Sequence, residues 1–438
     1  MGNETNTGAM SIEARTIRKL RARILPFIFV LYVICYLDRT NISFAALTMN
    51  QELGITSEQY GMLVGIFFFG YFLFEIPSNL LLHKIGARIW IARILITWGM
   101  VATLTGFVHT VHQLYVVRFL LGLAEAGYVP GIYLYLTYWF PQREQARVIA
   151  LFLTGLPVTS ILGAPVSGVI LDHVHWLGVS SWRWLLILEA IPAIVLGFLT
   201  YSLLPGRPQE AKFLTGDEKE WIRTELEREE VEKLKQRQYS VLQALTSGRV
   251  WHLVLIYSGM MMGRYTMSFW VPQIVQVLSG RYSNSVVGLL VMIPSLAGLA
   301  AMIPVSRSSD RRQERKYHVA IPAIIAGVAL ALLGTTRSPF LAVTLLSLVE
   351  VSLCSFLGPF WAIPSEFLSG LSVAAGFALI NSVGNLGGFA GPWAVGLIKQ
   401  RTGSLYGGLA LVGVCLFISA MLVLRLPRTA RGSLSDSG

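Results

Sequence analysis

Long apolar segments, separated by short polar ones, run through almost the whole chain. A helix needs about 20 mostly apolar residues to cross a bilayer, whereas the strands of a membrane barrel alternate over about ten residues. The pattern therefore predicts an all-α membrane protein with twelve transmembrane helices. The twelve segments lie near residues 25–47, 59–82, 89–108, 112–139, 146–171, 183–204, 251–279, 285–305, 318–335, 339–363, 372–398 and 405–426.

One long polar segment, residues 205–249, separates the first six apolar segments from the last six. Within it, Thr215 is followed three residues later by Glu218, a spacing typical of the first turn of a helix. We expect a surface helix there, in a linker between two six-helix pseudo-symmetric bundles. The predicted organisation is a cytoplasmic N-terminal segment (1–24), a first bundle (25–204), a cytoplasmic linker (205–250), a second bundle (251–428) and a cytoplasmic tail (429–438).

Composition supports the same class of protein. Hydrophobic residues make up 54% of the chain and charged residues only 13%, against about 25% charged residues in soluble proteins. The net charge is +11, but the Lys and Arg residues lie between apolar segments and not along one soluble face. No nucleic-acid partner is therefore expected. The polar, basic start of the chain predicts no cleavable signal peptide. The three cysteines are far apart in apolar segments, which predicts neither a disulfide framework nor a metal site.

The basic residues also predict an orientation. With the N-terminus in the cytoplasm, 27 of the 35 Lys and Arg residues lie on the cytoplasmic side, 5 lie outside and 3 lie within spans. Cytoplasmic segments of membrane proteins are enriched in Lys and Arg. We therefore expect both termini in the cytoplasm.

Asp38, Arg39 and Asn41 interrupt the first span. A charged side chain at the centre of a bilayer costs roughly 2.5–3.5 kcal/mol, so such residues are expected to face a cavity or a partner and to act on ions or substrate. The alternative is an Asp38–Arg39 pair that only holds helices together. That alternative is weaker, because neighbouring residues on a helix point in different directions.

The fourth span carries Arg118 and Glu125, seven residues apart and therefore about 10 Å apart on nearly one helix face. A guanidinium offers paired donors that match a carboxylate substrate. A buried carboxylate can exchange a proton near neutral pH. Asp38 and Glu125 are thus candidate proton carriers, and a structural Arg118–Glu125 pair is the alternative.

The two halves of the chain resemble each other. The segment Arg39-Thr-Asn-Ile-Ser43-Phe44 has a counterpart 225 residues later in Arg264-Tyr-Thr-Met-Ser268-Phe269. Such a repeat favours a substrate site between two bundles, near the middle of the membrane. A second arginine would suit a dicarboxylate. The alternative is that Arg264 contacts a backbone carbonyl or an acidic side chain.

Several motifs carry a family resemblance. The segment Asn79-Leu-Leu-Leu-His-Lys-Ile-Gly-Ala-Arg88 resembles the loop motif of the major facilitator superfamily, with Asn79 and His83 in place of its usual Gly and Asp. Four further motifs resemble the anion:cation symporter branch of that superfamily, which contains carriers for sugar acids, tartrate and aromatic acids. They are Tyr36-Leu-Asp-Arg-Thr-Asn41, Phe74-Glu-Ile-Pro-Ser-Asn-Leu-Leu81, Arg118-Phe-Leu-Leu-Gly-Leu-Ala-Glu-Ala-Gly127 and Ser268-Phe-Trp-Val-Pro-Gln273.

The resemblance implies roles for individual residues. It makes Asp38 and Glu125 the proton-coupling pair and Arg39 the residue that binds the anion. The substrate-binding candidates, from the resemblance and from the residues themselves, are Arg39, Tyr36, Asn41, Tyr71, Arg118, Arg264, Ser268, Trp361, Asn381 and Asn385. The gating-loop candidates are His83, Lys84, Gly86 and Arg88 in the first half and Asp310 and Arg311 in the second. Glu75 and Glu189 are expected to be structural partners of loop cations.

The sequence therefore predicts a monomeric secondary transporter that imports an organic anion, such as tartrate or a sugar acid, by proton symport with alternating access. It needs no cofactor, and the proton is the coupling ion. Neither a nucleophile–base set nor metal ligands can be recognised in the sequence, so an enzyme is not expected. Three alternatives stay open: an aromatic-acid symporter, a sodium-coupled or exchange carrier, and a sensor with a transporter fold.

Overall fold

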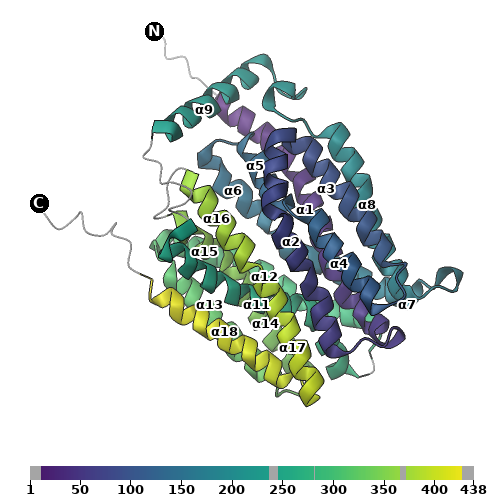
Figure 1. Cartoon of the computed structure of the whole chain (residues 1–438). Helices are drawn as coiled ribbons and strands as arrows, with labels where there is room; N and C mark the ends of the chain where they lie inside the picture. The colour runs from purple at the N-terminus through teal and green to yellow at the C-terminus, as the bar shows by residue number, and fades with distance from the viewer. Residues whose placement is uncertain (1–10, 236–244, 281, 366–370, 427–438) are drawn as a thin grey trace, which may run out of the picture.

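The computed structural model describes residues 11–235, 245–280, 282–365 and 371–426, and in these ranges all regular structure is helical (Figure 1). The helices of the first half are α1 (Ile12–Glu52), α2 (Ser57–Ile85), α3 (Ala87–Thr105), α4 (Val111–Glu125), α5 (Tyr128–Thr137), α6 (Gln142–Leu153), α7 (Gly155–His173) and α8 (Ser181–Leu203). The linker contains α9 (Gly216–Lys235). The helices of the second half are α11 (Gly248–Ser279), α12 (Asn284–Arg312), α13 (Lys316–Leu333), α14 (Pro339–Ser355), α15 (Leu357–Ser365), α16 (Leu371–Gly384), α17 (Gly387–Thr402) and α18 (Tyr406–Leu424). Two short 3₁₀ helices, η1 (Trp176–Gly178) and η2 (Pro208–Glu210), lie in connections.

These helices form the twelve predicted spans. Ten segments in the described part of the chain are long and apolar enough to cross a membrane. The other two spans are α11 and the pair α16 and α17. Four spans are built from two helices in succession: α4 with α5, α6 with α7, α14 with α15, and α16 with α17.

The break between α4 and α5 has a local cause. Gly127 adopts a φ of +84°, a left-handed conformation that residues with a side chain rarely adopt. A Cβ atom at this position would also lie 2.3 Å from Ser78 Oγ on α2. Glycine is therefore required here both by the backbone and by the close approach of α2. The break leaves Glu125 as the last residue of α4.

The twelve spans pack as two bundles of six that meet chiefly through three helix pairs, with a smaller contact between α16 and α2 (Figure 1). Within the first half, α3 packs on α8, and α2 packs on α4. Within the second half, α13 packs on α18, and α12 packs on α14. Between the halves, α7 packs on α12, α2 packs on α17, and α1 packs on α11. The spaces between the bundles are thus bordered by α1, α2, α7, α11, α12 and α17.

The two ends of the molecule differ. We call the end that carries α9 the linker end and the opposite one the far end. At the far end the halves are in close contact, because a Cβ on Gly168 would lie 2.3 Å from Asn284 O and a Cβ on Gly288 would lie 2.3 Å from Ala164 O. The Asp172 carboxylate at the end of α7 also accepts hydrogen bonds from the backbone and side chains of Asn284 and Ser285, at 2.6–3.1 Å. These contacts hold α7 against the first turn of α12.

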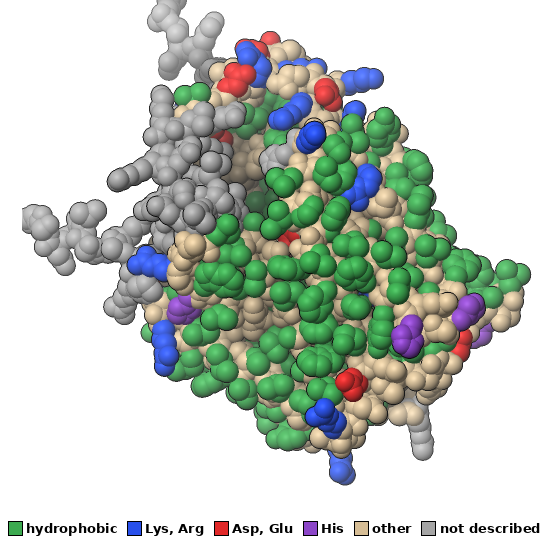
Figure 2. Space-filling model, viewed as in Figure 1, with side chains coloured by type: hydrophobic (Ala, Val, Ile, Leu, Met, Phe, Trp, Pro, Cys, Tyr) green, Lys and Arg blue, Asp and Glu red, His purple; other side chains and the backbone are tan. Residues whose placement is uncertain are grey.

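The surface is that expected for a lipid environment. Figure 2 shows hydrophobic side chains covering the middle of the visible face, with Lys, Arg, Asp and Glu concentrated around α9. Large apolar side chains such as Leu73, Leu80 and Phe198 are 57–67% exposed. Large contiguous patches of exposed apolar side chains are rare on soluble monomers. The exposed side chains therefore fit a protein that spans a membrane.

The linker helix α9 packs against the first half. The buried Glu218 carboxylate accepts from Arg15 Nε and Lys19 Nζ on α1, each at 2.9 Å, and from the backbone N–H of Thr215 at 2.9 Å. Burial raises the pKa of Glu218, but the Thr215 N–H and the Lys19 ammonium together hold it below its usual range. A carboxylate at the first turn also suits the positive end of the α9 dipole.

Candidate substrate and coupling site

Asp38 and Arg39 point to different partners, as the sequence predicted for neighbours on a helix. Asp38, 2% exposed, accepts a hydrogen bond from Trp98 Nε1 on α3 and one from Asn41 Nδ2 at 3.2 Å. Arg39, 4% exposed, forms an ion pair with Glu125 at the end of α4. The Asp38–Arg39 pair that would only hold helices together is therefore not formed.

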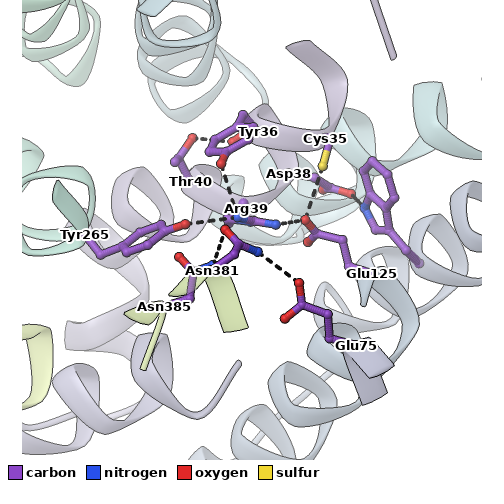
Figure 3. Close-up of polar contacts among 11 residues, drawn as sticks. Cys35, Tyr36, Asp38, Arg39, Thr40, Glu75, Glu125, Tyr265, Asn381 and Asn385 are labelled. Atoms are coloured by element: carbon purple, nitrogen blue, oxygen red, sulfur yellow. Dashed lines mark hydrogen bonds and ion pairs between the residues drawn. The ribbon is translucent and has the colours of Figure 1, made fainter. Parts of the chain in front are cut away.

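Arg39 lies at the centre of the polar contacts drawn in Figure 3. Its Nη1 donates to Tyr265 Oη of the second half at 3.2 Å and to Tyr36 Oη at 3.5 Å. Its Cζ also lies 4.7 Å from the ring centre of Tyr36, 5.1 Å from that of Phe67 and 5.5 Å from that of Tyr71. Aromatic faces of this kind stabilise a guanidinium without neutralising it. The Tyr265 contact joins the two halves directly at the charged group.

The structural Arg118–Glu125 pair considered from the sequence is wrong. Glu125 pairs with Arg39 and accepts a thiol hydrogen bond from Cys35 at 3.2 Å. Arg118 is 1% exposed, and its Nε and Nη2 have no hydrogen-bond partner among the described residues. Its Cζ lies 5.6 Å from the Phe67 ring, so the same ring contacts both guanidinium groups. The physical reason is that Glu125 ends its helix beside α1, two turns away from Arg118.

A second group of polar contacts reaches across to α16. Asn381 Nδ2 donates to Glu75 Oε1 on α2 at 2.9 Å, and Asn385 Nδ2 donates to Asn381 Oδ1 at 3.2 Å (Figure 3). Glu189 accepts from Ser167 Oγ at 2.7 Å. Glu75 bonds to a neutral side chain of the other half and Glu189 to one of its own half, so the prediction that they pair with loop cations is wrong. Helix rotation places both carboxylates inward.

The second half contains its own ion pair. Arg264 Nη1 donates to Glu350 Oε1 on α14 at 2.6 Å, and the Cys354 thiol lies 3.6 Å from the same nitrogen. Arg264 and Glu350 line a pocket between α1, α7, α11, α12 and α14, which Asn41 and Ser268 also line. The sequence analysis left open that Arg264 contacts an acidic side chain, and the structure confirms this contact.

Trp361 lies on α15 in an aromatic cluster of the second half. Its ring centre is 5.0 Å from that of Phe377, in a stacked arrangement, and 5.1 Å from that of Tyr257. Phe360 lies 5.4 Å away. Trp361 therefore packs against other aromatic side chains. Its predicted role in substrate binding stays a prediction.

The gating-loop candidates lie at the linker end. Gly86, with a φ of +97°, joins α2 to α3, and Lys84 is exposed. Arg88 lies 3.8 Å from Glu210, and Asp310 accepts from Arg315 at 2.6 Å. Arg311 is exposed at the end of α12, and the side chain of His83 lies outside the described residues. Neither contact joins the two halves, because Glu210 belongs to the linker and Asp310 and Arg315 both belong to the second half, and the gating roles stay predictions.

Four contributing residues were not assigned to the site by the sequence analysis. Trp98 and Cys35 contact the two acids, and Tyr265 bonds to Arg39 from the second half. The fourth, Glu350, could have been found, because it lies 225 residues after Glu125, the spacing that relates Arg264 to Arg39. The tyrosine, tryptophan and cysteine carry no comparable signal, since such side chains in apolar helices usually serve packing.

The chain is similar to known proteins over nearly its full length. The family described as Major Facilitator Superfamily matches residues 28–392. A protein of Agrobacterium vitis named "Putative tartrate transporter" is 45% identical over 419 residues, 96% of each chain. The "Putative metabolite transport protein NicT" of Pseudomonas putida is 39% identical. The alignment covers 93% of this chain and 94% of the Pseudomonas putida protein.

The fold is also similar to a solved structure. A bacterial homolog of the human lysosomal transporter Spinster, in an inward-facing and occupied conformation, aligns with a TM-score of 0.72 and 15% sequence identity. The alignment covers 95% of this chain and 97% of that one. At this identity the similarity supports the arrangement of the helices and carries no information on substrate.

Proposed function

The chain belongs to the Major Facilitator Superfamily of membrane transporters, and from this premise we propose that it imports an organic acid, such as tartrate or a sugar acid, by proton symport. The observation that carries the proposal is the buried Arg39–Glu125 pair at the contact between the two halves. It combines an anion-binding group with a group that can take up a proton. The name of the Agrobacterium vitis relative supports tartrate as the first substrate to test.

The pair suggests how proton and anion are coupled. While Glu125 is ionised, it neutralises Arg39 and competes with any carboxylate that approaches. A proton on Glu125 removes this competitor, so Arg39 can bind the substrate carboxylate with its paired donors. Arg118, whose Nε and Nη2 have no partner among the described residues, adds positive potential beside the Phe67 ring that also contacts Arg39. Binding of the anion and of the proton therefore favour each other.

A second proton is assigned to Asp38, which Trp98 and Asn41 hold in place. With Asp38 and Glu125 both neutral and Arg39 paired with substrate, the halves can reorient without leaving any of these three groups as an unpaired buried charge, which would be costly. Reorientation requires the far-end contacts to open and the linker end to close, as in alternating access. Two protons with a monoanionic sugar acid would move net positive charge inward, so its uptake should respond to membrane potential, whereas two protons with the tartrate dianion would carry no net charge.

We further propose that the linker end faces the cytoplasm of a bacterial cell and that the protein works as a monomer in the inner membrane. The proposal is supported by the distribution of Lys and Arg along the sequence, which gives 27 of them to the predicted cytoplasmic segments and 5 to the predicted outer segments. The rule that basic residues stay inside applies to these short connections. Both termini are then cytoplasmic.

The test is uptake into proteoliposomes under an inward proton gradient, with tartrate, galactonate, glucarate and hydroxyphenylacetate as candidate substrates. We expect one acid to accumulate and a protonophore to abolish its accumulation. In Glu125→Gln, gradient-driven accumulation should fall at least about tenfold, because an amide cannot release a proton, whereas exchange of internal for external substrate should persist. Glu227→Gln, on the exposed face of α9, is the matched control and should behave as the unmodified protein.

Three results would contradict the proposal. Accumulation that needs sodium, or an anion on the opposite side, would replace proton symport by another coupling. Accumulation of hydroxyphenylacetate alone would replace the hydroxy acid by an aromatic acid. Binding of an acid without any accumulation would identify a sensor.

A further inference from the structure

The proposed mechanism leaves one buried ion pair unused. Arg264 and Glu350 are 8% and 9% exposed, and their 2.6 Å contact joins α11 to α14 within the second half. A buried pair of this kind is weak evidence for stability, because removing two charges from water offsets most of their attraction. Stability alone therefore does not account for the presence of both charges.

The second pair is the repeat of the first. Arg264 lies 225 residues after Arg39, and Glu350 lies 225 residues after Glu125. Each arginine is consequently 86 residues from its glutamate. In each half a cysteine thiol donates to the glutamate, at 3.2 Å from Cys35 and at 3.5 Å from Cys354. The same internal repeat thus builds an arginine–glutamate pair in both bundles, whereas the two thiols come from non-equivalent positions, Cys35 beside Arg39 on α1 and Cys354 beside Glu350 on α14.

The second pair also faces open space between the halves. Arg264 and Glu350 line the pocket between α1, α7, α11, α12 and α14. The remaining walls offer hydroxyl and amide groups that can bond to a hydroxylated substrate; they include Thr40, Asn41, Thr159, Ser160, Ser268 and Ser295. Tyr265, the residue after Arg264, bonds to Arg39, so the pocket adjoins the first site.

We infer that this pocket is a second carboxylate site, in which Arg264 binds the far carboxylate of a hydroxylated dicarboxylate and Glu350 takes up the accompanying proton. The inference rests on the proposed function. While Glu350 is ionised, it occupies Arg264 and repels an arriving carboxylate. A proton from water, transferred to a Glu350 oxygen, leaves a neutral carboxyl group and a guanidinium that pairs with the substrate. The net charge of the pocket is zero before and after this step.

Among the described residues that line the pocket, Glu350 is the only acid, and two further acids, Asp38 and Glu189, bond to the lining side chains of Asn41 and Ser167. The charged or titratable groups near the pair are Arg264, the Cys354 thiol on the same helix as Glu350, and Tyr36 from α1. From α12, Ser295 lines the pocket, and Gly298 packs against Glu350. The buried face of α13, which packs against α14, consists of Val, Ala, Gly and Leu. Proton exchange in the pocket is therefore assigned to Glu350.

The first measurement compares two substrates that differ only at one end. Tartrate and threonate have the same four-carbon hydroxylated skeleton, but threonate carries an alcohol where tartrate has its second carboxylate. In Arg264→Gln, the ratio of tartrate to threonate uptake in proteoliposomes should fall at least about tenfold, since a bond to a charged group is lost. Arg223→Gln combined with Glu227→Gln, which removes an exposed pair on α9, is the matched control and should leave the ratio unchanged.

The second measurement counts protons. In Glu350→Gln, the number of protons that enter with each tartrate should fall by about one, because the amide neither carries a proton nor repels a carboxylate. A pair that only holds α11 to α14 would change the amount of folded protein but not this ratio. If either single variant fails to fold, the double variant Arg264→Gln with Glu350→Gln removes both charges together, and the tartrate preference should be lost in it as well.

The outcomes separate this inference from the proposed function. If the unmodified protein accumulates neither acid under a proton gradient, the proposed function fails, and the second site fails with it. If it accumulates tartrate, but the proton count and the tartrate to threonate ratio are the same in all pocket variants, the second site is wrong and the proposed function stands.

Discussion

At the scale of single residues, the site contains two arginines in contrasting situations. Arg39 is paired with Glu125 and bonded to Tyr265, whereas Arg118 is equally buried and has two nitrogens without a partner in the described part of the chain. A buried charge that lacks a partner destabilises the folded protein. A residue kept at such a cost is expected to act in function, and this contrast can be tested.

We predict that Arg118→Gln removes gradient-driven uptake. The same substitution should raise the melting temperature of the purified protein, because it removes a buried charge that lacks a partner. Arg39→Gln should remove uptake and also lower the melting temperature, because it leaves Glu125 as an unpaired buried charge at a cost of about 3–5 kcal/mol. Thermal unfolding in detergent, measured beside uptake in proteoliposomes, checks both. A strongly lowered melting temperature in Arg118→Gln would show that this arginine has a structural partner.

At the scale of elements, α9 is held to the first half by a compact group of contacts. Glu218 bonds to α1 through Arg15 and Lys19, and Glu225 accepts from Arg143 on α6 at 2.9 Å. All of these partners belong to the first half or to α9 itself. We therefore expect α9 to move with the first half when the two halves reorient.

We predict that Glu218→Gln increases amide hydrogen exchange in residues 216–235 at least about tenfold at pH 7, because three bonds to a charged carboxylate are weakened. The pKa of Glu218 in the folded protein is lowered, so its stabilising contribution is complete above the unfolded pKa of about 4.3. The contribution is lost as the pH falls through the folded value. The variant and the unmodified protein should thus become alike only below the folded-state pKa of Glu218, which lies under its unfolded value. Equal exchange at pH 7 would contradict this account, and Glu220→Gln on the exposed face of α9 is the control.

At the scale of the whole molecule, the structure is closed at the far end. Glycines at the α7–α12 contact permit backbone approach, and Asp172 bonds to the first residues of α12 across the contact. Such bonds have to break if the far end opens. Asp172 therefore contributes to the free-energy difference between the closed arrangement and any arrangement open at this end.

We predict that Asp172→Ala shifts the protein toward an arrangement that is open at the far end. Loss of bonds to a carboxylate worth about 1.5–3 kcal/mol changes the ratio of the two arrangements at least about tenfold. Spin labels on the exposed residues Leu177 and Tyr282, one on each half, should then show a longer distance component. Asp217→Asn on α9 is the control. An unchanged distance distribution in Asp172→Ala would mean that the glycine contacts alone keep the far end closed.

The sequence by itself determined the number of spans, their division into two halves and the positions of the buried charges. The physical reason is that a bilayer demands apolar helices of fixed minimum length, so every charge inside a span stands out. The internal repeat was also visible, because equivalent residues keep a constant spacing of 225.

Only the tertiary structure decided which charges meet. Glu125 could have paired with Arg118 on its own helix, but the end of α4 places it beside Arg39 on α1. Glu350 lies 86 residues from Arg264, and Tyr265 contacts Arg39 across the two halves. Such partnerships depend on the rotation of each helix about its axis and on which helices are neighbours. These features are set by packing between segments far apart in the chain, which no local pattern of residues records.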